Sequence, residues 1–212
     1  MAFIPVDMET YSRREHYEHY KNNVPCTYSM TANVDITGLK EKAAERGVKF
    51  YPTLIYVIAK AVNGSEEFRT CHDKNGVLGY YDVLHPTYTV FDKKSETFSS
   101  LWTQYDEDFH TFCKNVENDI TAFTGRGFLP QKDAPENLLN ISAIPWRSFT
   151  GFNLNLPLGH EFYLPIFTAG KYFTENGKTF IPLSVQVHHA VCDGFHVCRL
   201  LDDIENIVKT LQ

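Results

Sequence analysis

The spacing of apolar and polar positions predicts a chain that mixes helices with strands. Apolar residues recur at intervals of three and four from Val197 to Leu211 with charged residues between them, which is typical of an amphipathic helix. A second apolar stripe at helical spacing follows Pro52, a residue type that often begins a helix. A third stripe runs over residues 104–125, so we expect helices in all three places.

Strand signals fill much of the remaining chain. Between residues 83 and 102 the pattern predicts strands interrupted near Asp92, and Asn176-Gly177 is a hairpin signal. Because helices and strands do not alternate strictly, the expected fold class is α/β in the broad sense: an α+β two-layer sandwich whose mixed β-sheet is covered by helices. Further runs with strand character occupy residues 26–36, 140–144, 152–156, 162–167 and 179–187.

Length and composition fit one domain. The 212 residues contain no internal repeat, low-complexity tract or obvious linker, so we expect a single domain over residues 1–212. The aromatic content of 14% suits a β-rich core, an aromatic pocket or a subunit interface.

Charge and cysteine usage exclude several classes of partner. The net charge is −6 and no block of Lys or Arg stands out, so we expect no nucleic-acid partner. No run approaches the roughly 18 apolar residues of a membrane span, and the first residues lack the apolar core of a signal peptide, so we expect a cytoplasmic protein that does not bind membranes. The five cysteines are odd in number and widely spread, which favours reduced thiols over disulfides.

The candidate chemistry lies where the last predicted strand meets the last predicted helix. His188 and His189 end the strand, and Asp193-Gly194 precede the helix. Because side chains alternate along a strand, the two imidazoles point in opposite directions, so they cannot easily act together and one of them is structural. Gly194 supplies conformational freedom that a turn can use. These features favour a functional site without identifying a reaction.

This segment carries a known signature. His188 to Gly194 fit the HHxxxDG pattern of CoA-dependent acyltransferases, which is moderately specific alone. A set of further blocks, in family order over nearly the whole chain, resembles the type A chloramphenicol acetyltransferase family, and this ordered set is much more specific. The blocks are Arg13–His16, Tyr20, Val24–Cys26, Tyr51–Pro52, Glu96–Ser99, Pro135–Asn137, Asn140–Trp146, Phe152–Asn155 and Leu183–His196.

The resemblance implies the CoA-dependent acyltransferase fold and a direct transfer reaction. It implies that His189 acts as general base on the primary (C3) hydroxyl of chloramphenicol, which then attacks the thioester of acetyl-CoA. Imidazole suits this task because it gains and loses a proton near neutral pH. By the same resemblance, Ser142 donates a hydrogen bond to the tetrahedral oxyanion, and Asp193 pairs with Arg13 to brace the turn that carries His189.

The resemblance also implies two binding regions and an assembly. The positions that match the chloramphenicol pocket are mostly apolar or aromatic, as a nitrophenyl ring with a dichloroacetyl tail requires: Tyr20, Val24, Cys26, Tyr28, Phe98, Phe152, Leu154, Leu156, Ile166 and Thr168. The positions that match the acetyl-CoA site are Lys49, Trp146, Lys171 and Tyr172. The family is a homotrimer with active sites between subunits, so we expect His189 from one protomer and much of the Tyr20–Tyr28 wall from the next. No metal is implied.

Three alternatives stay open at this point. An acyltransferase of the same fold with another acceptor, such as a dihydrolipoyl acyltransferase, also carries HHxxxDG, although such domains are normally tethered to a lipoyl-bearing segment. A metal site through His188, His189, Asp193 and His196 is disfavoured because ligands must converge on the ion and the two adjacent imidazoles diverge. A non-catalytic protein that binds hydrophobic ligands is the third alternative.

Overall fold

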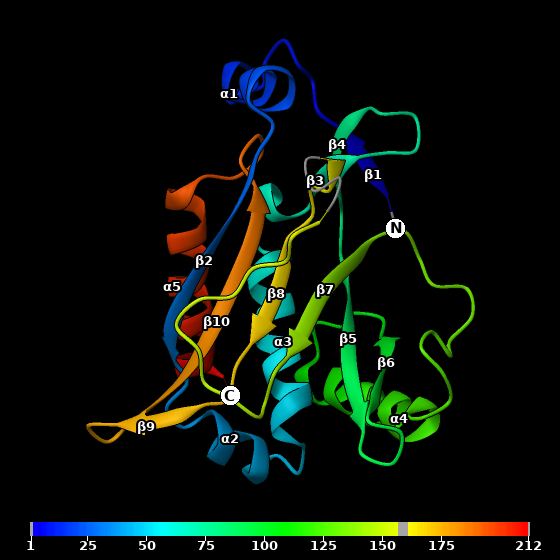
Figure 1. The fold of residues 1–212 in the computed structure, drawn as a ribbon, viewed down its shortest axis with the longest axis vertical. Helices are drawn as coiled ribbons and strands as arrows, with labels where there is room; N and C mark the ends of the chain where they lie inside the picture. Colours follow the sequence, from blue (N-terminus) through cyan, green and yellow to red (C-terminus); the bar gives the residue numbers. More distant parts are fainter. Residues whose placement is uncertain (1, 157–160, 212) are drawn as a thin grey trace.

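The structure, a computed structural model, describes residues 2–156 and 161–211 and is built around a seven-stranded mixed sheet (Figure 1). Six strands follow the order β2, β10, β8, β7, β5, β6, and β9 pairs with the start of β10. β7 is parallel to both neighbours, and the other pairs are antiparallel. The strands are β2 (Thr27–Asp35), β5 (His85–Asp92), β6 (Thr97–Trp102), β7 (Leu138–Ala143), β8 (Ile166–Ala169), β9 (Phe173–Glu175) and β10 (Lys178–His188).

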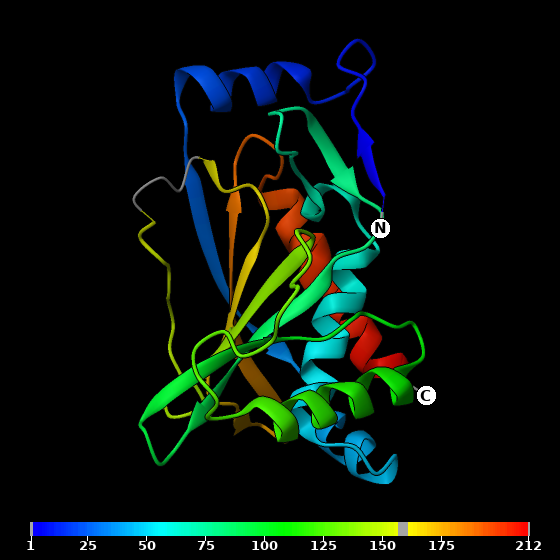
Figure 2. The same ribbon diagram turned by 90° about the vertical axis from the view of Figure 1, so that its right-hand side faces the viewer.

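Helices cover one face of this sheet (Figure 2). They are α2 (Leu39–Glu45), α3 (Phe50–Asn63), α4 (Phe109–Phe123) and α5 (Gly194–Thr210), and α3 packs against the other three. The opposite face, which we call the open face, is crossed by the segment that follows β7 (Figure 2). The expected two-layer arrangement with a mixed sheet is therefore confirmed.

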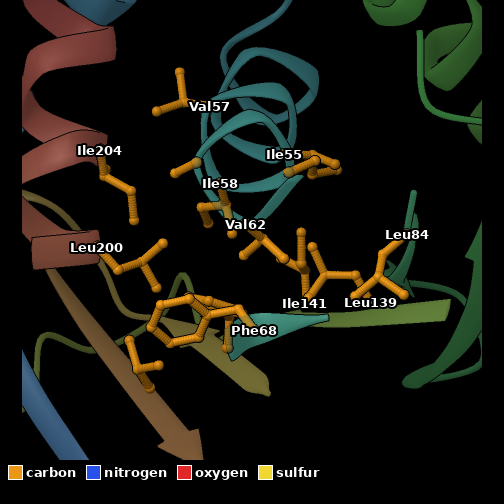
Figure 3. Close-up of a cluster of buried hydrophobic side chains, with 14 of the residues drawn as sticks. Ile55, Val57, Ile58, Val62, Phe68, Leu84, Leu139, Ile141, Leu200 and Ile204 are labelled. Carbon is orange, nitrogen blue, oxygen red and sulfur yellow. The ribbon is translucent and has the colours of Figure 1, made fainter. Parts of the chain in front are cut away.

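The core lies between α3 and the sheet, where apolar side chains of three elements meet (Figure 3). Leu139 and Ile141 of β7 and Leu200 and Ile204 of α5 are at most 2% exposed and pack in the cluster around α3. Burying each such side chain stabilises the fold by about 1.5–3 kcal/mol relative to leaving it in water. The cluster members on α3 are Ile55, Val57, Ile58 and Val62.

The helix predictions are confirmed with shifted ends. α3 begins at Phe50 instead of Pro52, because proline is tolerated anywhere in a first turn, where its missing N–H has no intrahelical partner. α4 begins at Phe109, because the Asp108 side chain accepts the Thr111 N–H at 2.8 Å and so caps the helix there. The sequence pattern did not predict α2.

The final helix, α5, begins directly after the turn that ends β10. Val197, Leu200, Ile204 and Val208 are its buried residues, which confirms the apolar stripe read from the sequence. Gly194 opens the helix but does not adopt a left-handed φ, so its backbone freedom is not what the turn uses.

The strand predictions are confirmed except over two segments. Residues 152–156 are extended but form no ladder, because their backbone bonds to side chains of β10: Leu154 N donates to Gln186 Oε1 at 2.8 Å, and Ser184 Oγ donates to Phe152 O. β8 begins at Ile166, so residues 162–165 are not a strand. The predicted hairpin is present, with φ of 50° at Asn176 and 76° at Gly177 between β9 and β10.

A second, smaller layer lies beyond the ends of β2 and β10. Helices α1 (Arg14–Glu18) and η1 (His19–Asn23) run across the top of the molecule in Figure 2. Beside them lies a three-stranded sheet of β1 (Phe3–Pro5), β4 (Leu78–Tyr81) and β3 (Thr70–His72). The short helix η2 (Glu66–Phe68) directly precedes β3 in the chain. Among the described residues, no helix combines the length and the apolar character needed to cross a membrane.

Candidate active site

The two adjacent histidines at the end of β10 have different surroundings. The His188 ring is fully buried and stacks on Tyr163, with ring centroids 4.2 Å apart and an interplanar angle of 12°. Its Nδ1 accepts the Ala190 N–H at 3.0 Å, so this nitrogen carries no proton. His188 is therefore held in one orientation by the protein interior and fixes the turn that follows it.

His189 is half-buried and meets a different set of rings. It stacks on Tyr20 at a centroid distance of 3.9 Å and meets Tyr28 edge to face at 5.3 Å. Its backbone N–H donates to Cys26 O at 3.1 Å, and its Nδ1 has no hydrogen-bond partner among the described residues. Burial raises the pKa of the Cys26 thiol, which keeps that thiol protonated.

One expectation is wrong at this point. Tyr20 and Tyr28 contact His189 of the same chain, whereas we expected much of this wall to come from a neighbouring protomer. The reason is that η1 lies over the end of β10 and brings Tyr20 onto the imidazole, while β2 is the strand paired with β10, with Tyr28 opposite Val187.

A network of charged groups holds the turn beyond His189. Arg13 Nη1 donates to Asp193 Oδ2 at 2.6 Å and so joins the N-terminal end of α1 to the start of α5. On the other side, His196 Nδ1 lies 2.8 Å from Asp193 Oδ1, and Glu67 contacts both His196 at 3.6 Å and Arg199 at 3.0 Å. Burial alone raises the pKa of Asp193, but the hydrogen bond and charge of Arg13, with His196, outweigh it and lower that pKa.

Ser142 lies in a second region, on the open face of the sheet. The strand registers place one hydroxyl residue from each of five strands in a row across this face. Within the row, Ser142 Oγ lies 3.2 Å from Thr89 Oγ1. The members of the row are Thr31, Ser184, Thr168, Ser142 and Thr89, and Thr89 was not identified from the sequence because no local pattern distinguishes it from other strand threonines.

A cavity of about 640 Å³ opens beside Ser142. Its lining is mainly apolar and aromatic and includes Trp146, Lys171 and Tyr172, three of the residues expected at the acetyl-CoA site. It also includes Phe98, which was expected in the chloramphenicol pocket. Lys49 is exposed and does not line the cavity, although it directly precedes α3.

The remaining expected pocket residues lie on or beside the open face, except one. Phe152, Leu154 and Leu156 belong to the segment that crosses this face. On β8, Ile166 begins the strand opposite Gln186, and Thr168 is 2% exposed in the hydroxyl row. Val24 follows η1 and is 50% exposed.

The structure does not bring Ser142 and His189 of one chain together. Ser142 pairs with Thr168 and Thr168 with Ser184, so Ser142 is level with a residue five positions before His189 on β10. At about 3.3 Å per residue and about 4.8 Å between strands, the two lie roughly 16 Å apart along the sheet and roughly 10 Å across it. A base and an oxyanion donor must both reach the same reacting atoms. The roles expected for His189 and Ser142 would therefore place them in two separate half-sites of one chain.

A stack of rings behind His188 was also not identified from the sequence. Tyr163 packs between His188 and His72, whose ring it meets at 4.4 Å, and His72 Nε2 lies 2.7 Å from the Tyr17 hydroxyl. These rings come from four separate parts of the chain, and only the folded register brings them together. In the part of the chain that the structure describes, no three His, Cys, Asp or Glu residues are placed to share a metal ion.

Comparisons with known proteins agree on one family. A family model described as chloramphenicol acetyltransferase matches residues 1–205. A chloramphenicol acetyltransferase of Clostridium perfringens is 49% identical over 213 residues, which cover 100% of this chain and 97% of that protein. A chloramphenicol acetyltransferase of Campylobacter coli is 50% identical over 210 residues, which cover 99% of this chain and 100% of that protein.

Solved structures show the same fold at lower identity. A chloramphenicol acetyltransferase superposes with a TM-score of 0.87 at 23% identity, covering 98% of this chain and 100% of that one. A dihydrolipoamide acetyltransferase of Azotobacter vinelandii has a TM-score of 0.68 at 17% identity, covering 93% and 86% of the two chains. The expected acyltransferase fold is therefore confirmed.

Proposed function

Because the chain belongs to the chloramphenicol acetyltransferase family, we propose that it transfers the acetyl group of acetyl-CoA to the primary (C3) hydroxyl of chloramphenicol and so inactivates this antibiotic. The match over residues 1–205, with relatives half identical along their whole length, is the observation that carries this proposal. The chain is thus an acyltransferase that uses acetyl-CoA as cosubstrate.

His189 is the general base in this reaction. Its ring is half-buried between Tyr20 and Tyr28, so it has a fixed plane yet stays accessible to a substrate hydroxyl. It removes the proton of the C3 hydroxyl, whose oxygen attacks the thioester carbon. The bond to sulfur then breaks, and the protonated His189 returns its proton to the sulfur, so that CoA leaves as the thiol. The Asp193–Arg13 pair does not exchange protons with the substrate; it holds the turn that carries the base.

Ser142 and the cavity beside it receive the acetyl donor. The thioester carbonyl becomes an oxyanion during attack, and the Ser142 hydroxyl donates a hydrogen bond to it. The apolar wall suits the pantetheine arm of acetyl-CoA. Trp146 and Tyr172 stand at the mouth, each more than 40% exposed, and the lysines Lys171 and Lys49 suit its phosphate groups.

The two half-sites work together in a homotrimer. The His189 half of one protomer faces the Ser142 half of the next, and Phe98, Phe152, Leu154 and Ile166 of that second half supply the apolar wall for chloramphenicol. A heterologous contact of this kind closes into a ring when the rotation permits. Light scattering is expected to give about three times 24.4 kDa. We place the enzyme in the cytoplasm, where acetyl-CoA is made and where its five free cysteines stay reduced.

An acceptor panel tests this function. Thiol release from acetyl-CoA is measured with chloramphenicol, with an analogue that has fluorine in place of the primary hydroxyl, and with dihydrolipoamide. We expect turnover with chloramphenicol alone, because the analogue lacks the nucleophile. Turnover with dihydrolipoamide but not with chloramphenicol would contradict the proposal and assign the enzyme to the alternative acceptor.

A further inference from the structure

The contacts of the Thr89 side chain indicate a function for its hydroxyl group. Its hydroxyl lies 3.2 Å from Ser142 Oγ, a distance at which the two hydroxyl groups form a hydrogen bond. The position is fixed twice: Tyr88 and Ile141, the residues just before Thr89 and Ser142, are partners in the β5–β7 ladder, and the Tyr51 hydroxyl of α3 donates to Thr89 O at 3.0 Å.

The direction of this hydrogen bond decides whether Ser142 can stabilise an oxyanion. A hydroxyl has one proton to donate, and either of two hydroxyls at this distance can be the donor. If Ser142 donates to Thr89, its proton points away from the cavity. If Thr89 donates to Ser142, the proton of Ser142 is free to point into the cavity that both residues line.

We propose that Thr89 is a positioning residue for Ser142, donating its hydroxyl proton to Ser142 Oγ and so directing the Ser142 proton at the oxyanion of the transferring acetyl group. The inference rests on the proposed function, in which Ser142 is the oxyanion donor. Two hydroxyls in series also polarise each other, which strengthens the bond from Ser142 to the negatively charged oxygen.

Strand formation does not explain why a hydroxyl stands at position 89. Valine has the same shape as threonine and an equal preference for strands, and the ladder of β5 uses only the backbone of Thr89. The residue faces the cavity beside Ser142 instead of the apolar core around α3. Replacing the hydroxyl with a methyl group therefore removes one hydrogen bond and leaves the fold and cavity shape unchanged.

Three variants test the proposal by steady-state kinetics. Thr89→Val is expected to lower kcat about 3- to 10-fold, because this is the effect of losing one neutral hydrogen bond. The KM for each substrate is expected to stay within about twofold of the wild-type value. Thr89→Ser keeps the donor and is expected to restore most of kcat. Thr87→Val is the matched control: it removes a hydroxyl from the same face of β5 that bonds only to Ser100 and to Leu101 O, so kcat is expected to stay at the wild-type value.

A double-mutant cycle shows whether Thr89 acts through Ser142. In a Ser142→Ala background, Thr89→Val is expected to cause no further loss, because the group it orients is gone. An equal loss in both backgrounds would overturn the proposal, as would a Thr89→Val enzyme with wild-type kcat, or one in which only KM for acetyl-CoA rises. A Ser142→Ala enzyme with wild-type kcat would instead refute the oxyanion role of Ser142 in the proposed function, and this inference with it.

Discussion

At the scale of single residues, neighbouring histidines differ because of what each ring touches. His188 is enclosed by Tyr163 and accepts the Ala190 N–H, so its ring has no access to a substrate. The His189 ring is half-buried, and its Nδ1 is a buried nitrogen without a protein partner in the described chain. Of the two rings, only His189 is partly accessible, which agrees with the general-base role proposed for it.

Replacing His189 tests this division. His189→Ala is expected to lower kcat by at least 10²-fold, because general bases contribute about 10²–10⁴ in rate, while the dissociation constant for chloramphenicol changes little. Turnover is measured by thiol release and binding by titration calorimetry. His110→Ala, an exposed histidine of α4, serves as the control and is expected to behave as wild type. Residual activity above a few per cent in His189→Ala would mean that another group removes the proton.

The sequence names the motif residues but not the residues that contact them in the fold. His189, Asp193 and Ser142 were located by a pattern that repeats across a family. Thr89 and Tyr163 were missed, because what distinguishes them is a contact with a residue more than 20 positions away. Such contacts depend on strand register, and register is set by the packing of whole strands and not by any short stretch of sequence.

At the scale of elements, the Arg13–Asp193 pair joins α1 to α5, and its stabilisation depends on pH. The pKa of Asp193 is lowered in the folded chain, so its contribution is fully present above the unfolded value of about 3.9 and is lost as the pH falls through the folded pKa. Asp193→Asn is therefore expected to lower the Tm at pH 7, and the Tm curves of wild type and variant are expected to converge as the pH falls below about 4.

A matched surface variant checks the pH prediction. Asp202→Asn removes an exposed carboxylate on the same helix and is expected to leave the Tm unchanged across this range. Thermal scans followed by circular dichroism measure both curves. Parallel curves for wild type and Asp193→Asn would show that the carboxylate is not the source of the stabilisation.

The ring stack behind His188 joins the small sheet to β10, and its loss is expected to affect catalysis through the turn. Tyr163 is 5% exposed and lines a cavity of about 320 Å³ together with His72, so its position depends on the two rings it touches. Tyr163→Leu is expected to destabilise the fold by about 1–3 kcal/mol and to lower kcat at least about tenfold, because His188 loses its stacking partner. Tyr163→Phe keeps the ring and is expected to retain activity.

Phe112→Leu is the control for this effect. Phe112 is a fully buried aromatic residue of α4, remote from β10, so its replacement is expected to lower the Tm without changing kcat per folded molecule. Thermal scans give the Tm of each variant, and kinetics at saturating substrate give its kcat. An equal fall of kcat in Phe112→Leu and Tyr163→Leu would show that general loosening of the core, and not the stack, is responsible.

Elements were predictable where one face of a periodic pattern is buried. The stripe of α5 matches its buried residues because a single helix packs one side against the core. Residues 152–156 also alternate, yet they form no ladder, because Gln186 and Ser184 side chains satisfy their backbone groups instead. Local alternation indicates an extended chain and cannot specify which groups will bond to it.

At the scale of the whole molecule, the separation of His189 from Ser142 has a consequence that mixed assemblies reveal. His189→Ala and Ser142→Ala are each expected to be nearly inactive alone. When the two variants assemble randomly in equal amounts, a site that takes its histidine from one protomer and its serine from the next has both groups intact in about a quarter of cases, as for any heterologous interface.

Differently tagged copies of the two variants, co-expressed and purified through both tags, provide the measurement. We expect thiol release with chloramphenicol to recover to about a third of the wild-type rate per site, since every trimer that carries both tags has both groups intact in one of its three sites. A mixture of the separately assembled variants is the control and is expected to stay inactive. Because the register of β7, β8 and β10 keeps the two groups of one chain far apart, recovery follows only if the sites form between chains; an inactive mixed assembly would mean that each chain closes a complete site by itself.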